Sequence, residues 1–190
     1  MDIQTPYGLI TIIDEPTYSF KSTDNTHAYV HQLLLTDGSI TSVHGVKQNG
    51  ENILVIGAGG GCTAIHEHSA TAVDDKLYIA VGDRVACLSL EHPDQILWTA
   101  KVDTATCFGI YWENQHRVLL SHGELEITRL SIDGDIIWQV SGAEIFPEGF
   151  RLLSDYIEAV DFDRSVYWFD YMTGELLYCL PSSDCRPVGG

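Results

Sequence analysis

The sequence predicts an all-β fold made of repeated antiparallel units of four strands each. Short segments rich in β-branched and aromatic residues, such as LYIAV (77–81) and YIEAV (156–160), alternate with polar turns at hairpin spacing. The segment 70–180 contains no sustained helical period of apolar residues. Strands therefore account for the apolar segments better than helices do.

Three segments of the chain repeat the same order of strand, turn, strand, turn and strand. They span 70–102, 107–140 and 149–180, and their closing strands carry Trp98, Trp138 and Tyr178, which are spaced forty residues apart. An apolar pair precedes each of these aromatic residues, and a polar turn (HPDQ, DGD or TGE) precedes each pair. Such a period indicates a repeat architecture. Regular short strands are typical of a propeller, with a β-sandwich or a barrel as the alternatives.

The N-terminal part is less regular but has the same character. Segments 7–14 and 51–57 read as strands, and 27–46 reads as two strands joined by a turn at Asp37 and Gly38. A tally gives about sixteen strands, or roughly four sheets. We expect one all-β domain over 1–190, with irregular strands in 1–61 and units at 62–106, 107–148 and 149–183.

The first unit also resembles a known family. Residues 69–102, SATAVDDKLYIAVGDRVACLSLEHPDQILWTAKV, are similar to a blade of the quinoprotein (PQQ-like) β-propeller repeats, and the resemblance extends over about 70–180. It implies a small, propeller-like arrangement of blades. The chain is short for the usual seven or eight blades, and the glycine-bearing docking pattern that follows the Trp in quinone enzymes is missing. The resemblance therefore implies neither a bound quinone nor a dehydrogenase.

The net charge of −17, with only ten Lys and Arg residues, restricts the partners. Nucleic-acid phosphates and anionic lipids would be repelled, whereas a basic protein would be attracted. An acidic surface also keeps a β-rich protein soluble without any dedicated partner.

The start of the chain has acidic residues where a signal peptide would be basic, and no apolar run approaches the ~20 residues that span a bilayer. We therefore expect a cytoplasmic protein without a membrane segment. The five cysteines, whose spacing fits neither a disulfide framework nor a zinc ribbon, are expected to be free thiols: Cys62, Cys87, Cys107, Cys179 and Cys185.

The stretch ILVIGAGGGCTAIHEH (53–68) allows three interpretations. In the first, the glycines at 57–61 form a nucleotide-binding loop, with Asp83 as the acid that contacts a ribose. That site requires a helix after the loop and parallel strands around it. The segment that follows, CTAIHEHSATAV (62–73), is too short and too rich in β-branched residues for such a helix.

In the second interpretation, His66 and His68 bind a divalent metal. Residues two apart on a strand face the same side, so both imidazoles would reach one ion. A cupin-like spacing is loosely present, with Asp75 as a later acid, but Leu152 stands where a second cupin motif would place a histidine.

In the third interpretation, which we favour, the glycines let the backbone pass closely between two sheets, and AIHEHSATAV (64–73) is the first strand of the next unit.

Two further groups are interpreted as turns. Ser121, His122 and Glu124 lack the nucleophile elbow of a hydrolase, and Asp161 and Asp163 fall where the other units have turns. No segment supplies a specific catalytic set, so we expect no bound cofactor and a small acidic binding module rather than an enzyme. Because open sheet edges favour association, we also expect either N-terminal strands that complete the last sheet or a homodimer.

Overall fold

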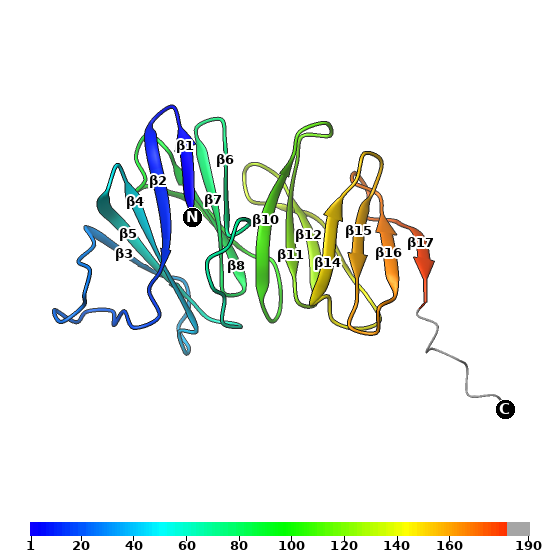
Figure 1. Cartoon of the computed structure of the whole chain (residues 1–190), viewed down its shortest axis with the longest axis horizontal. Coiled ribbons are helices and arrows are strands. Elements are labelled where there is room, and N and C mark those ends of the chain that lie inside the picture. Colours follow the sequence, from blue (N-terminus) through cyan, green and yellow to red (C-terminus); the bar gives the residue numbers. More distant parts are fainter. Residues whose placement is uncertain (182–190) are drawn as a thin grey trace.

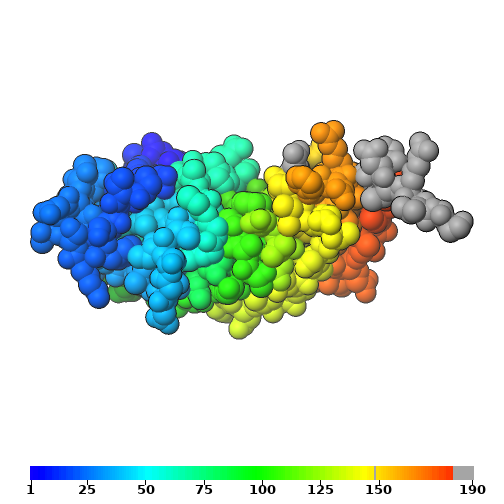
Figure 2. Space-filling view, turned by 90° about the horizontal axis from the view of Figure 1, so that it is seen from below, coloured from blue at the N-terminus to red at the C-terminus, as the bar shows by residue number. Residues whose placement is uncertain are grey.

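The structure is a computed structural model that describes residues 1–181. In this part of the chain, seventeen β-strands form four sheets and no residue is helical. The sheets follow one another in chain order along the long axis of the molecule, and the first and last sheets lie at opposite ends (Figures 1 and 2). The described strands form blade-like units, as the repeats predict, and these units lie in an open row and not a closed ring (Figure 1). The N-terminal strands belong to the first sheet, so the expectation that they complete the last sheet is wrong.

The first unit is a four-stranded antiparallel sheet with one additional strand. Its antiparallel strands are β1 (Asp2–Thr5), β2 (Gly8–Asp14), β4 (Ser42–Gln48) and β5 (Glu51–Ala58). Strand β3 (His31–Leu34) pairs in parallel with β5. The predicted hairpin around Asp37 and Gly38 is therefore wrong, because β3 and β4 are separated by β5 and do not pair.

The other three units are up-and-down meanders whose strands pair in chain order. The second unit contains β6 (Ala70–Val73), β7 (Lys76–Val81), β8 (Arg84–Ser89) and β9 (Ile96–Lys101). The third contains β10 (Cys107–Glu113), β11 (Val118–Gly123), β12 (Glu126–Leu130) and β13 (Ile136–Ser141). The fourth contains β14 (Glu148–Leu152), β15 (Ile157–Val160), β16 (Val166–Phe169) and β17 (Leu176–Leu180).

Apolar side chains fill the space between neighbouring sheets. Because alternate residues of a strand point to opposite faces, each central strand contributes to two interfaces. In β7, for example, Leu77 and Ile79 pack toward the first unit, whereas Tyr78 and Ala80 pack toward the third. This use of both faces explains why the central strands are apolar throughout rather than alternating.

Backbone hydrogen bonds repeat at each junction between units. The turn at Gly82 and Asp83 is held from both sides, because Asp83 N–H donates to Gly59 O (3.0 Å) and Cys107 N–H donates to Gly82 O (2.7 Å). The next junctions use equivalent bonds: Glu124 N–H to Thr106 O (2.7 Å), Phe146 N–H to Glu124 O (2.6 Å) and Phe162 N–H to Ile145 O (2.8 Å). The connection between two units is thereby fastened to the middle turn of each.

The carboxylate of Asp103 strengthens the junction between the second and third units. This side chain is fully buried. Its Oδ1 accepts the N–H groups of Ala105 (2.6 Å) and Thr106 (3.0 Å), and its Oδ2 accepts those of Leu125 (2.9 Å) and Glu126 (2.8 Å). Four charge-assisted hydrogen bonds fix the connecting segment against the β11–β12 turn.

The closing tryptophans dock on the next unit. Trp98 Nε1 donates to Ile132 O at 3.0 Å, and its ring lies over Gly134, which has φ +93°. Trp138 repeats this contact with Tyr171 O (3.1 Å) and Gly174 (φ +72°). The glycine that each tryptophan contacts lies in the turn before the closing strand of the following unit.

The described cysteines have free thiols, of which Cys87 and Cys107 are buried and Cys62 and Cys179 are exposed. Cys185 lies outside the described residues. Within the described chain, no helix is long and apolar enough to cross a membrane.

The Trp98 contact predicts the effect of replacing Gly134 by Ala. A Cβ there would lie 2.6 Å from Trp98 Cδ2, in addition to the strain of a positive φ. We expect Gly134→Ala to lower the free energy of unfolding by about 3 kcal/mol, as measured by urea denaturation. Gly50→Ala is the matched control, because Gly50 has φ +89° but no neighbour within 4 Å of the added Cβ. It should lose only about 1 kcal/mol, and equal losses in the two variants would contradict the docking role.

Candidate binding site on the inner face

The glycine-rich stretch connects the first unit to the second. Gly57 lies within β5, which ends at Ala58, and residues 59–69 form a loop that leads to β6. A Cβ on Gly60, which has φ +89°, would lie 2.4 Å from Ala105 O, and one on Gly61 would lie 1.7 Å from Thr106 Oγ1. Glycine is therefore required here by the close approach of another connection. No helix follows the loop, so the helix N-terminus that a nucleotide site needs is not formed by these residues.

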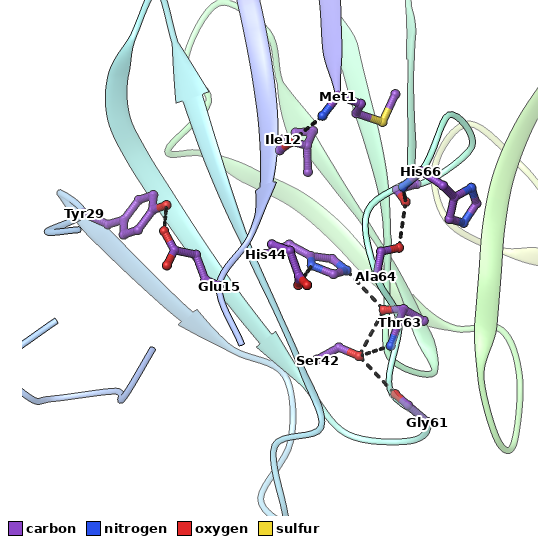
Figure 3. A network of polar contacts seen from close by, with 12 residues as sticks. Met1, Ile12, Glu15, Tyr29, Ser42, His44, Gly61, Thr63, Ala64 and His66 are labelled. Atoms are coloured by element: carbon purple, nitrogen blue, oxygen red, sulfur yellow. Dashed lines mark hydrogen bonds and ion pairs between the residues drawn. The ribbon is translucent and has the colours of Figure 1, made fainter. Parts of the chain in front are cut away.

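A polar network fastens the loop to β4, as Figure 3 shows. Ser42 Oγ donates to Gly61 O (3.0 Å) and accepts the N–H of Thr63 (2.8 Å). His44 Nε2 lies 3.1 Å from Thr63 Oγ1. His44 is fully buried, and this burial lowers its pKa despite the nearby Asp14 carboxylate. These contacts hold residues 61–63 in a fixed position beside the first sheet.

The two histidines proposed as metal ligands lie in this loop and not on a strand. The predicted strand over 64–73 is wrong before residue 70, because His66 uses its side chain to shape a turn. Its Nε2 donates to Phe108 O at 2.7 Å, and its Nδ1 accepts the N–H of His68 at 3.2 Å. Both ring nitrogens of His66 are thus engaged by the backbone, and the His66 and His68 ring centroids are 6.2 Å apart.

Over residues 1–181, no three His, Cys, Asp or Glu side chains form a group that could hold a metal ion. The divalent-metal hypothesis stays a prediction. Binding by His66 would require loss of one of its two backbone hydrogen bonds, and elemental analysis of the purified chain tests it directly.

A pocket of about 510 Å³ opens on the side of the row where the first strands of the last three units lie, which we call the inner face. Strands β6, β10 and β14 each contribute to its wall. The lining residues that carry the argument are Glu67, His68, Tyr111, Trp112, Phe150 and Arg151.

Aromatic rings form a continuous row that starts at the pocket wall and ends at His122, which is buried behind the wall. His68 stacks on Tyr111 with centroids 4.2 Å apart, Tyr111 contacts Phe150 at 4.8 Å, and Phe150 stacks on His122 at 4.6 Å. Burial raises the pKa of Tyr111 to about 12 and lowers the pKa of His122 to about 4. Desolvation also lowers the pKa of His68. The row is therefore uncharged at neutral pH.

Charged groups lie at the rim of this row. The Glu67 carboxylate is largely exposed, whereas Arg151 forms an ion pair with Glu158. Trp112, at the pocket edge, lies 5.5 Å under the guanidinium of Arg117. The arrangement offers stacking surface beside the exposed carboxylate of Glu67, whose Oε1 lies 3.5 Å from His68 Nε2.

Of the residues that the sequence places in turns, Asp161 lies in one, whereas Ser121 and His122 do not. Ser121 and His122 lie buried within β11, and His122 Nε2 donates to Phe146 O at 3.0 Å. The prediction that both lie in a turn is therefore wrong. Asp161 does lie in a turn, where it accepts Ser165 N–H and Tyr167 O–H, both at 2.8 Å. Tyr111 and Phe150 carried no motif; the one available signal was that both fall on the first strand of a unit.

The burial of His122 predicts a pH-dependent stability. The unfolded chain binds a proton at His122 below about pH 6.5, whereas the folded chain keeps this ring neutral until about pH 4. The contribution of the neutral ring is thus complete above about pH 6.5 and is lost as the pH falls toward 4.

Between about pH 7 and pH 5, His122→Gln should lose about 2 kcal/mol less free energy of unfolding than the unmodified chain, measured by urea denaturation at both pH values. His92→Gln, at an exposed turn residue, is the control and should leave the pH dependence unchanged. Equal slopes for His122→Gln and the unmodified chain would contradict the assignment.

Comparisons with known proteins identify the fold. No protein-family model and no curated protein matches the sequence. Among solved structures, BamB from Moraxella catarrhalis is 16% identical with a TM-score of 0.52, over 74% of this chain and 43% of that one. The WD40 β-propeller domain of Doa1 is 16% identical with a TM-score of 0.52, over 74% and 48%. The computationally designed Ika8 protein is 10% identical with a TM-score of 0.53, over 77% and 48%.

This chain thus spans less than half the length of the propeller structures that it resembles. At these identities the likeness concerns the fold alone. It agrees with the quinoprotein-like repeat seen in the sequence over 70–180. The chain is an all-β protein of small, propeller-like fold, built from four blade-like antiparallel sheets.

Proposed function

We propose that this chain is a non-enzymatic binding module that holds a basic protein segment on its inner face. The observation that carries the proposal is the pocket of about 510 Å³ whose walls come from the first strands of three consecutive units. A surface shared by three sheets suits an extended segment of a partner, because successive side chains can contact successive units.

The chemistry of the pocket supports recognition rather than catalysis. The lining rings of His68, Tyr111 and Phe150 are neutral and engaged in stacking, which favours contact with apolar, aromatic or cationic side chains. Glu67, whose side chain is largely exposed beside His68, could pair with a Lys or Arg of the partner.

The charge of the whole chain supports the same class of partner. A net charge of −17 attracts a basic segment over a distance of about one Debye length or more. We propose that this field sets the rate of association and that the rings provide the contact area. We also propose a cytoplasmic location, which rests on the composition of the chain.

Two labelled peptides test the proposal by fluorescence anisotropy. The first alternates Leu or Tyr with Lys or Arg, and the second replaces every Lys and Arg by Glu. We expect binding of the basic peptide only, with an affinity that falls as NaCl is raised.

Tyr111→Ala should weaken binding of the basic peptide about tenfold or more, because the pocket loses a central ring. Tyr7→Ala, at a half-exposed tyrosine of the first unit, is the matched control and should bind normally. Glu67→Gln should reduce the salt dependence, whereas Glu91→Gln on an exposed outer turn should not. Equal binding of both peptides, or an unaffected Tyr111→Ala variant, would overturn the proposal.

A further inference from the structure

The two ends of the row differ. At the first unit, residues 15–30 fold over the side of the sheet that faces away from the second unit. Tyr18, Phe20 and Tyr29 pack there on Val43 and Val55. Two contacts of Glu15 hold this segment in place. Tyr29 O–H donates to Glu15 Oε1 at 2.6 Å, as Figure 3 shows, and His27 Nδ1 lies 2.6 Å from the same oxygen. The first sheet is therefore covered on both faces.

At the fourth unit, the face turned away from the third unit has no covering sheet among the described residues. We call it the terminal face and define it by Arg151, Glu158, Trp168, Tyr178 and Leu180. The first four are direct cross-strand partners, and Leu180 follows Tyr178 by two residues, so all five point to one side. The opposite side, with Ile157 and Phe169, packs on the third unit.

The equivalent positions of the preceding units form the interfaces already described. In the third unit the corresponding row is Tyr111, Leu120, Arg129 and Trp138. Tyr111, Leu120 and Trp138 from this row pack against the fourth unit. Tyr178 occupies the position of Trp98 and Trp138, yet 44% of it is exposed, and Leu180 is 52% exposed. Tyr178 is therefore not packed between two sheets of the described chain.

The terminal face is suited to bury more surface. Trp168 lies 4.5 Å from Tyr156 and 4.7 Å from Tyr178, measured between ring centroids, which makes a row of three aromatic rings. The one buried charge beneath them, Glu158, is already neutralised by Arg151 and accepts the Trp168 indole N–H at 3.1 Å. A partner that covers this face would not leave an unpaired charge behind.

We propose that the terminal face is the interface of a homodimer in which the fourth sheets of two copies pack face to face. Continuity with the repeated sheet-on-sheet interface indicates that the occupant is another such sheet. A head-to-tail arrangement would place the terminal face on the outer face of a first sheet, and residues 15–30 already cover that face. The same face must therefore pair with itself, which gives an isologous contact that stops at two copies.

The salt dependence of dimerisation should differ from the salt dependence of peptide binding at the inner face. Each copy has a net charge of −17, so two copies repel each other through their bodies, while the described charges of the interface cancel. Added salt screens the repulsion and leaves the apolar contact intact. Dimerisation should therefore strengthen with salt, whereas binding of a basic peptide to the inner face should weaken. Failure of one proposal leaves the other intact.

The test is the molar mass of the full chain in solution, measured by sedimentation or by light scattering after gel filtration. We expect the mass of two chains, with a dissociation constant that falls severalfold from low to high NaCl. Tyr178→Lys combined with Leu180→Lys should give the mass of one chain. Ile137→Lys, at a 50% exposed position on the outer strand of the third unit, is the matched control and should remain a dimer.

Folding of each variant is checked by circular dichroism, and Tyr178→Ser provides a second, milder substitution, with a weakened dimer expected. A one-chain mass for the unmodified protein, a dimer that survives the double substitution, masses above two chains, or dissociation promoted by salt would each overturn the proposal. A monomeric full chain that dimerises only after removal of residues 182–190 would also overturn it, because that segment would then occupy the face.

Discussion

Each central sheet of this chain has two apolar faces, and only a neighbouring sheet can cover them. The alternation of side chains makes this unavoidable: in β7, Leu77 and Ile79 are fully buried on one side, and Tyr78 and Ala80 are buried on the other. One unit of four short strands buries too little surface by itself, so the stability of each unit depends on its neighbours, as in other repeat proteins. The order of the units, the docking of their tryptophans and the difference between the two ends all follow from this constraint.

The same constraint produces the inner face. Junctions that hold consecutive units at a repeated geometry bring their first strands to one side, and side chains about forty residues apart in sequence become neighbours. Tyr111 and Phe150, with ring centroids 4.8 Å apart, are the result. The glycine-rich loop serves this geometry, since Gly60 and Gly61 allow the connection at 105–106 to pass within contact distance. Its importance is therefore structural, and it positions His68 at the edge of the pocket.

Much of the architecture was predictable because the repeat leaves local signals. The spacing of Trp98, Trp138 and Tyr178, with an apolar pair before each, located the closing strands. Long-range effects were not predictable. Strand β3 joins β5 in parallel, which no turn signal announces. Residues 64–69 have strand-like composition, but the backbone hydrogen bonds of His66 and the Ser42–Thr63 contacts hold them as a loop. The ring row of the pocket depends on contacts between units, so no local pattern marks it.

The position shared by Thr71, Tyr111 and Arg151 shows how the surroundings decide the residue at the end of a row. All three begin the cross-strand row that faces the following unit. Tyr111 has a following sheet, and it both packs against that sheet and lines the pocket. No described sheet follows Arg151. At this position an arginine stands in place of the aromatic ring of Tyr111, and its guanidinium pairs with Glu158 and is largely exposed. The aromatic residues of the terminal face lie instead on its outer strands, at Trp168 and Tyr178. In the inner part of the terminal face, the charges of Arg151 and Glu158 already pair with each other. In the outer part, burial of the exposed side chains of Tyr178 and Leu180 would add stability.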